Sequence, residues 1–173
     1  INTALHCAHQ RLPLPLLFVC EDNGLGISVR TPGGWIESAY GSRPHLRYEA
    51  VDGHDPVGVF EVVDELGEWV RRMRRPAFLH LRTVRFGGHA GTDVEAAYRS
   101  QAEMRADATL DPILGTASAL VAAGRRTPAE LLVRHDVIRE RVYAAGRSAS
   151  ERPQLTSVEE VVRPLAPRRP ERV

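Results

Sequence analysis

The sequence has little of several features that define whole classes of protein. Among 173 residues there are 2 cysteines, Cys7 and Cys20, and their separation fits no metal-binding motif. We expect both thiols to be reduced and buried. The charges nearly cancel, because the chain has 23 basic and 22 acidic residues and a formal net charge of +1. This balance produces no broad field for nucleic acid, so no nucleic-acid partner is predicted.

Long hydrophobic runs are also missing. No stretch approaches the ~20 apolar residues of a membrane-spanning helix. The first ten residues, INTALHCAHQ, lack the charged and then apolar layout of a signal peptide. These two absences predict no membrane association and a cytoplasmic location. The chain starts with Ile1 in a pattern typical of a helix interior, so we expect a segment that is truncated at its amino end.

The sequence pattern predicts strands that alternate with helices. Apolar runs predict buried strands at residues 15–20, 46–51 and 77–84. Before the last of them, Asp55 and Pro56 provide an N-cap and a first-turn proline for a helix that runs to about residue 73. Strands that alternate with helices indicate a parallel sheet with helices on both faces. The predicted fold class is therefore α/β.

The part after Tyr98 is predicted to be helical. Three or four helices are expected, with capping-box signals at Ser100 to Glu103, Thr127 to Glu130 and Thr156 to Glu159. The last ten residues are rich in proline and arginine, which is the composition of a linker or tail.

The first strand ends in an unusually polar turn, Glu21-Asp22-Asn23-Gly24-Leu25-Gly26. In parallel α/β sheets, ligands bind beyond the carboxyl ends of the strands. The amide oxygen of Asn23 and the carbonyl oxygen of Leu25 are hard donors of the kind that Mg²⁺ accepts, with water, a carboxylate and phosphate oxygens in the other positions. The alternative is a plain turn, because Asn and Gly are common in turns for backbone reasons alone.

Several motifs then occur in one order along the chain. They are CEDNGLGISVRTP (20–32), LRYEAVDGHDP (46–56), RRPAFLHLRTVRF (74–86), RFGGHAGTDVEAAYRS (85–100) and LDPI (110–113). Together they resemble alpha-type subunits of thiamine-diphosphate-dependent 2-oxo acid dehydrogenases, and the fourth motif is most similar to the branched-chain type. The resemblance covers about residues 1–145 and implies the thiamine-diphosphate-binding fold. It divides the chain into a partial binding domain, 1–147, and a linker or tail, 148–173.

The resemblance assigns roles to five residues. Asn23 and Leu25 would be Mg²⁺ ligands, and Gly26 and Ile27 would belong to the same cofactor-binding turn. His89 would lie beside the diphosphate of the cofactor and take part catalytically in acyl transfer to lipoamide. A glycine-rich loop with a solvent-exposed histidine is the alternative interpretation of position 89.

The chain departs from the family pattern at several points. Glu21 occupies the position of an arginine in the branched-chain type, Asp22 replaces an asparagine, and Leu25 replaces a tyrosine. The Gly-Asp-Gly motif that provides the metal's carboxylate does not occur in these 173 residues, so the segment alone would have half a metal shell. Ala90 follows His89, whereas mitochondrial relatives have a serine that is regulated by phosphorylation, so that regulation is excluded at position 90.

The implied activity is decarboxylation of a 2-oxo acid followed by acyl transfer to a lipoyl-bearing acyltransferase. A beta-type subunit, or a fused beta-like region, would be the other partner, and the segment alone is expected to be inactive. Branched-chain, pyruvate and acetoin-type substrates all stay open. Two other functions are alternatives: a transketolase-like enzyme, against which the loop around His89 argues, and a non-catalytic remnant of the fold. The remaining histidines, His80 among them, are assigned to no cluster.

Overall fold

The computed structural model describes residues 1–165. Its central sheet has three parallel strands in the order β1-β5-β4. Their bounds are β1 (Leu17–Asp22), β4 (Arg47–Asp52) and β5 (Ala77–Arg82). The register places Asp22, Arg82 and Asp52 side by side at the carboxyl edge of the sheet. The predicted parallel α/β fold is confirmed.

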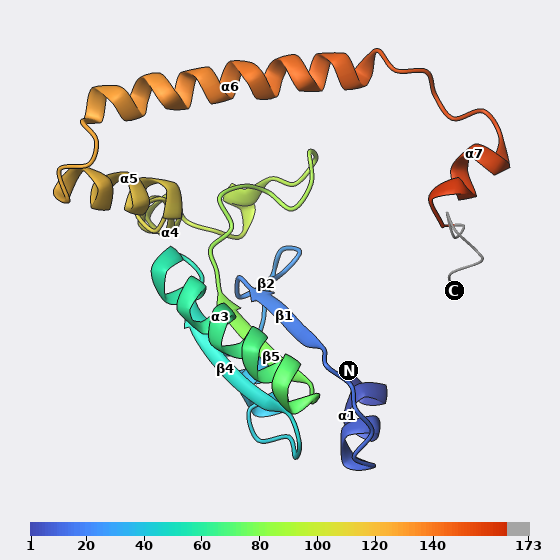
Figure 1. Cartoon of the computed structure of the whole chain (residues 1–173). Helices are drawn as coiled ribbons and strands as arrows, with labels where there is room; N and C mark the ends of the chain where they lie inside the picture. Colours follow the sequence, from blue (N-terminus) through green and yellow to red (C-terminus); the bar gives the residue numbers. More distant parts are fainter. Residues whose placement is uncertain (166–173) are drawn as a thin grey trace. The chain divides into compact units, whose positions relative to one another are not determined.

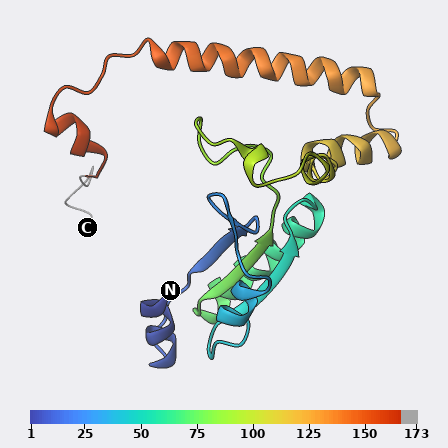
Figure 2. The same cartoon turned by 180° about the vertical axis from the view of Figure 1, so that it is seen from behind.

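Helices cover both faces of this sheet, as predicted. On one face, α3 (Pro56–Met73) places Leu66 and Val70 against β5, and this helix lies in front of the sheet in Figure 1. On the other face lies α2 (Trp35–Tyr40), which can be followed in the reverse view in Figure 2. It contributes Ile36 to a cluster around Phe78. The helix α1 (Asn2–His9) adds Leu5 to that cluster.

One strand is less buried than its sequence predicts. The expected strand 15–20 is β1, which forms an edge of the three-stranded sheet. Val19 is 53% exposed there. Its side chain points to the same face as Leu17, but α3 covers the central strand β5 more completely than this edge.

Local signals explain where α3 begins and ends. The Asp55 side chain accepts a hydrogen bond from the backbone N–H of Val57 at 3.2 Å, and Pro56 occupies the first helical position. Arg74 ends the helix in the left-handed conformation, with φ of 55°. Both predicted limits of this helix are confirmed.

A small hairpin that was not predicted follows β1. Its strands are β2 (Leu25–Gly26) and β3 (Val29–Arg30), and they pair antiparallel. Gly24 and Ile27 have positive φ values of 70° and 60°, which lets the chain turn tightly on each side of β2.

Contacts divide the chain into residues 1–125 and residues 126–173. The first unit also contains η1 (Glu95–Ala97), α4 (Gln101–Ala108) and α5 (Pro112–Ala122), and the second contains α6 (Pro128–Ser150), α7 (Val158–Val162) and η2 (Arg163–Leu165). Capping boxes start α4 at Ser100 and α6 at Thr127, as predicted.

The third capping box lies one residue later than predicted. Ser157, not Thr156, is the N-cap of α7, and its hydroxyl oxygen accepts the backbone N–H of Glu160 at 3.2 Å. The boundary predicted between residues 147 and 148 falls within α6 and stays a prediction, and most of the predicted proline- and arginine-rich tail lies outside the described residues. Within residues 1–165, no helix is long and apolar enough to cross a membrane.

Candidate functional site

Two consecutive side-chain-to-backbone hydrogen bonds shape the turn after β1. The Oδ1 atom of Asp22 accepts the N–H of Gly24 at 2.9 Å, and the Oδ1 atom of Asn23 accepts the N–H of Leu25 at 3.0 Å. The backbone N–H of Thr31 donates to the carbonyl oxygen of Gly24 at 3.0 Å. This turn is therefore a defined structure that presents oxygen atoms beyond the carboxyl end of a parallel strand.

The donor chemistry of the turn fits Mg²⁺ in kind but not in number. An amide oxygen has two lone pairs, so Asn23 retains one acceptor position beside its bond to Leu25. That position and the main-chain carbonyl of Leu25 offer two of the roughly six oxygen ligands that Mg²⁺ requires. Among residues 1–165, no group of three or more His, Cys, Asp or Glu side chains is placed to hold a metal by itself.

Arg85 joins this hairpin to the loop that contains His89. Its Nη1 atom donates to the carbonyl oxygen of Ile27 at 2.7 Å, and its Nη2 atom donates to the hydroxyl of Tyr98. The guanidinium carbon also lies 5.7 Å from the centre of the Tyr98 ring. The tertiary structure thus links the two segments that the sequence singled out, although they are far apart in the chain.

The loop around His89 is organised by the carboxylate of Asp93. Its Oδ2 atom accepts the backbone N–H of His89 and the hydroxyl of Tyr98, both at 2.6 Å, and lies 3.9 Å from Arg85. The Tyr98 hydroxyl, followed by the His89 N–H, holds the pKa of Asp93 below its ordinary value. At Gly88, a Cβ atom would lie 2.9 Å from the Asp93 carbonyl oxygen, so a larger residue would force this backbone to move.

The far side of the loop is anchored by Arg99. This side chain is buried and forms ion pairs with Glu95 and Asp107. Its Nη1 atom also donates to the carbonyl oxygen of Arg85 at 3.0 Å. The His89 imidazole itself is exposed, so the network fixes the backbone and leaves the ring accessible from solvent.

Sequence reasoning missed His80, which it assigned to no cluster. This side chain is only 6% exposed, and its two ring nitrogens contact Asp22 and Tyr48. The signal that the sequence offered was a histidine within an apolar strand. Finding its partner required the register, which places His80 opposite Cys20 and so brings it near Asp22 on the same face of β1.

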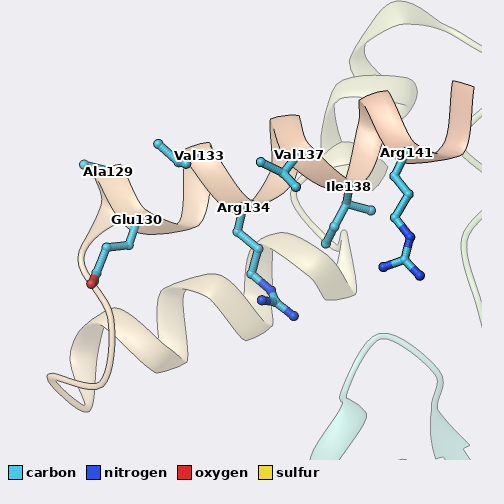
Figure 3. A pocket seen from close by; sticks show the side chains of 7 residues that line it. All are labelled: Ala129, Glu130, Val133, Arg134, Val137, Ile138 and Arg141. Atoms are coloured by element: carbon cyan, nitrogen blue, oxygen red, sulfur yellow. The ribbon is translucent and has the colours of Figure 1, made fainter. Parts of the chain in front are cut away.

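A separate set of apolar and charged side chains lies along α6 in the second unit, as Figure 3 shows. A shallow groove there is lined by Ala129, Glu130, Val133, Arg134, Val137, Ile138 and Arg141. None of the predicted site residues belongs to it.

A scan of protein families identifies the class. The model of the dehydrogenase E1 component matches residues 2–158, and the chain therefore belongs to the dehydrogenase E1 component family. The predicted family resemblance is confirmed.

Relatives with curated names agree with this class. The chain is 33% identical over 138 residues to pyruvate dehydrogenase E1 component subunit alpha type II, mitochondrial, of Ascaris suum, covering 79% of the chain and 35% of the relative. It is 33% identical over 97 residues to 2-oxoisovalerate dehydrogenase subunit alpha 2, mitochondrial, of Arabidopsis thaliana, covering 52% of the chain and 20% of the relative. It is 29% identical over 123 residues to pyruvate dehydrogenase E1 component subunit alpha, mitochondrial, of Saccharomyces cerevisiae, covering 68% of the chain and 29% of the relative.

These comparisons leave one prediction open and correct another. The chain spans about a third of the length of the Ascaris relative. The Ascaris pyruvate dehydrogenase relative and the Arabidopsis 2-oxoisovalerate dehydrogenase relative show the same 33% identity, over 138 and 97 residues, so the branched-chain type stays a prediction. The predicted cytoplasmic location was wrong, because the names of the relatives place them in mitochondria. The location was inferred from the lack of a signal-peptide pattern in residues 1–10, and that observation does not identify a compartment.

Proposed function

We propose that this chain is part of the alpha-type component of a thiamine-diphosphate-dependent 2-oxo acid dehydrogenase, which decarboxylates a 2-oxo acid and transfers the acyl group to lipoamide. The observation that carries the proposal is the hydrogen bond from Arg85 to Ile27, 2.7 Å long. It joins the proposed metal-binding turn to the proposed catalytic loop within a chain of the E1 family.

The cofactor would be held by the turn after β1. The side chain of Asn23 and the carbonyl of Leu25 would ligate Mg²⁺, and water, diphosphate oxygens and a carboxylate from outside these 173 residues would complete the shell. Gly26 and Ile27 would approach the cofactor through their backbone. When bound, thiamine diphosphate supplies the nucleophilic carbon and the electron sink that decarboxylation of a 2-oxo acid requires.

His89 would act on the acyl-transfer half of the reaction. Its backbone N–H is held by Asp93 at 2.6 Å, and its exposed imidazole has access to an incoming lipoyl group. When the acyl carbon bonds to one lipoyl sulfur, the S–S bond breaks and the other sulfur takes up a proton, which a positioned imidazole can donate as a general acid. Ala90, the next residue, has no hydroxyl and excludes phosphorylation at this position.

The proposed partners follow from the incomplete site. A beta-type subunit or a fused beta-like region would contribute the remaining catalytic groups, and a lipoyl-bearing acyltransferase would accept the product. We expect residues 1–173 alone to be inactive. The names of the relatives support both pyruvate and 2-oxoisovalerate as substrate types, and they favour a mitochondrial location.

A combined binding and activity measurement tests the function. The complete protein, assembled with its beta-type partner, would be titrated calorimetrically with thiamine diphosphate in Mg²⁺ and, as a control, in EDTA. We expect saturable binding that requires the metal, CO₂ release from pyruvate or 2-oxoisovalerate with an artificial electron acceptor, and acylation of a lipoyl domain. A folded complex that binds no cofactor and releases no CO₂ would instead identify a non-catalytic remnant of the fold.

A further inference from the structure

Three side chains form a hydrogen-bonded row across the sheet, one from each strand. The hydroxyl of Tyr48 in β4 lies 2.7 Å from Nδ1 of His80 in β5, and Nε2 of His80 lies 3.1 Å from Oδ2 of Asp22 in β1. Both pairs are partly buried, and His80 is 6% exposed. The row ends immediately before Asn23.

Only one arrangement of protons satisfies every atom when His80 is neutral and Asp22 is ionised. The carboxylate of Asp22 can only accept, and its Oδ1 atom already accepts the N–H of Gly24 at 2.9 Å. The Nε2–H of His80 must therefore donate to Oδ2 of Asp22, which leaves Nδ1 to accept the hydroxyl proton of Tyr48. Burial raises the pKa of Tyr48, which keeps that proton on the hydroxyl.

This row fixes the orientation of a carboxylate that shapes the turn. One oxygen of Asp22 is held by His80 and the other by Gly24, so the carboxylate cannot rotate without breaking a hydrogen bond. The adjacent Asn23 is thereby held in the conformation in which its side chain closes the second half of the turn. Polar groups that orient the ligands of a metal site typically change metal affinity by about 10 to 100-fold when they are removed.

We propose that Tyr48, His80 and Asp22 are positioning residues, which hold the turn of Asn23 in the geometry that binds Mg²⁺ and the diphosphate of the cofactor. This inference rests on the proposed function. None of the three residues need touch the metal, since their effect passes through the backbone of the turn.

Substitutions at His80 test the row in the complete protein. His80→Leu removes the donor to Asp22, and we expect the dissociation constant of Mg²⁺, measured at a fixed concentration of thiamine diphosphate, to rise by about 10-fold or more. His80→Gln places an amide N–H near the position of Nε2 and should recover most of the affinity. Tyr48→Phe breaks only the outer hydrogen bond and should cause a smaller loss.

A matched control lies at the same edge of the sheet. In the register of the sheet, Arg82 lies between Asp22 on one neighbouring strand and Asp52 on the other. Asp52 forms an exposed ion pair with Arg82 at 2.7 Å. Since Asp52 makes no hydrogen bond to the turn among the contacts described, Asp52→Ala should leave the Mg²⁺ affinity unchanged.

A spectroscopic readout separates positioning from simple packing. In Asp22→Asn, the new amide oxygen can still accept the N–H of Gly24, while its NH₂ group donates to Nε2 of His80. The His80 proton must then move to Nδ1 and donate to the oxygen of Tyr48. We expect the imidazole ¹⁵N shifts of ¹⁵N-histidine-labelled protein to show this exchange of tautomers without cofactor present, together with near-parental Mg²⁺ affinity.

Two sets of results would overturn the inference. One is parental Mg²⁺ affinity in a folded His80→Leu protein. If that variant does not fold, the other is parental affinity in Tyr48→Phe together with unchanged imidazole shifts in Asp22→Asn. If Asn23→Ala also binds Mg²⁺ and thiamine diphosphate like the parent, the assignment of Asn23 as a ligand fails as well. Loss of affinity in Asn23→Ala alone would refute only the positioning row, and a parent protein that binds no thiamine diphosphate would refute the proposed function.

Discussion

Replacing Asn23 with alanine removes two interactions at once. The turn loses the acceptor for the N–H of Leu25, now 3.0 Å from Oδ1, and an intramolecular hydrogen bond of this kind contributes about 0.5–1.5 kcal/mol net. The metal loses one of the two oxygen ligands that the turn offers. We expect the dissociation constant of thiamine diphosphate in Mg²⁺ to rise by about 10 to 100-fold in the complete protein, which corresponds to ~1.4–2.7 kcal/mol.

A second variant isolates the chemical reason for that loss. The side chain of Asn23→Asp still accepts the N–H of Leu25 and still offers an oxygen to Mg²⁺, so its affinity should stay near that of the parent. Asn2→Ala, which removes an exposed amide at the start of α1, is the matched control. Cofactor would be titrated by calorimetry or by quenching of tryptophan fluorescence. An unchanged titration of Asn23→Ala would refute the assignment of Asn23 as a ligand.

Three other results are expected. His89→Ala should slow acylation of the lipoyl domain by about 10²-fold or more while decarboxylation with an artificial acceptor persists in part; equal lipoyl rates in mutant and parent would contradict the proposed role. Leu79→Ala empties a fully buried position and should lower the free energy of unfolding by about 2–5 kcal/mol, measured by urea denaturation against the exposed control Leu155→Ala. Because the pKa of Asp93 is lowered in the folded loop, its carboxylate stabilises the loop above the ordinary aspartate pKa, and this contribution is lost as the pH falls through the lowered value. Tyr98→Phe removes the first cause of that shift. As the solution is acidified, the His89 amide of the variant should therefore lose its protection against hydrogen exchange at a higher pH than in the parent. An identical pH profile of protection would argue against the network.

Elements with local causes were predictable from the sequence. The start of α3 depends on Asp55 and Pro56, and the starts of α4 and α6 depend on capping boxes within four residues. The third box starts at Ser157 because the Ser157 hydroxyl accepts the backbone N–H of Glu160, whereas the Thr156 hydroxyl donates to the Glu160 carboxylate. A local pattern identifies such a start only to within about a residue or two.

The exposure of β1 required knowledge of the whole sheet. Its apolar sequence is typical of a buried strand, yet Val19 is 53% exposed because β1 is at an edge in the strand order β1-β5-β4. Apolar patterning reports that a segment is suited to a strand, but it does not determine which strand lies at the centre.

The sequence by itself determined the α/β class, the family and the positions of Asn23 and His89 within motifs. Only the tertiary structure decided that Arg85 reaches Ile27 and that His80 reaches Asp22, two contacts that each join residues 58 positions apart. Motifs and caps are properties of neighbouring residues, whereas these contacts depend on which strands pair and in which register. A shift of the register by one residue would turn His80 to the opposite face of the sheet, so the row across the sheet exists only in the folded chain.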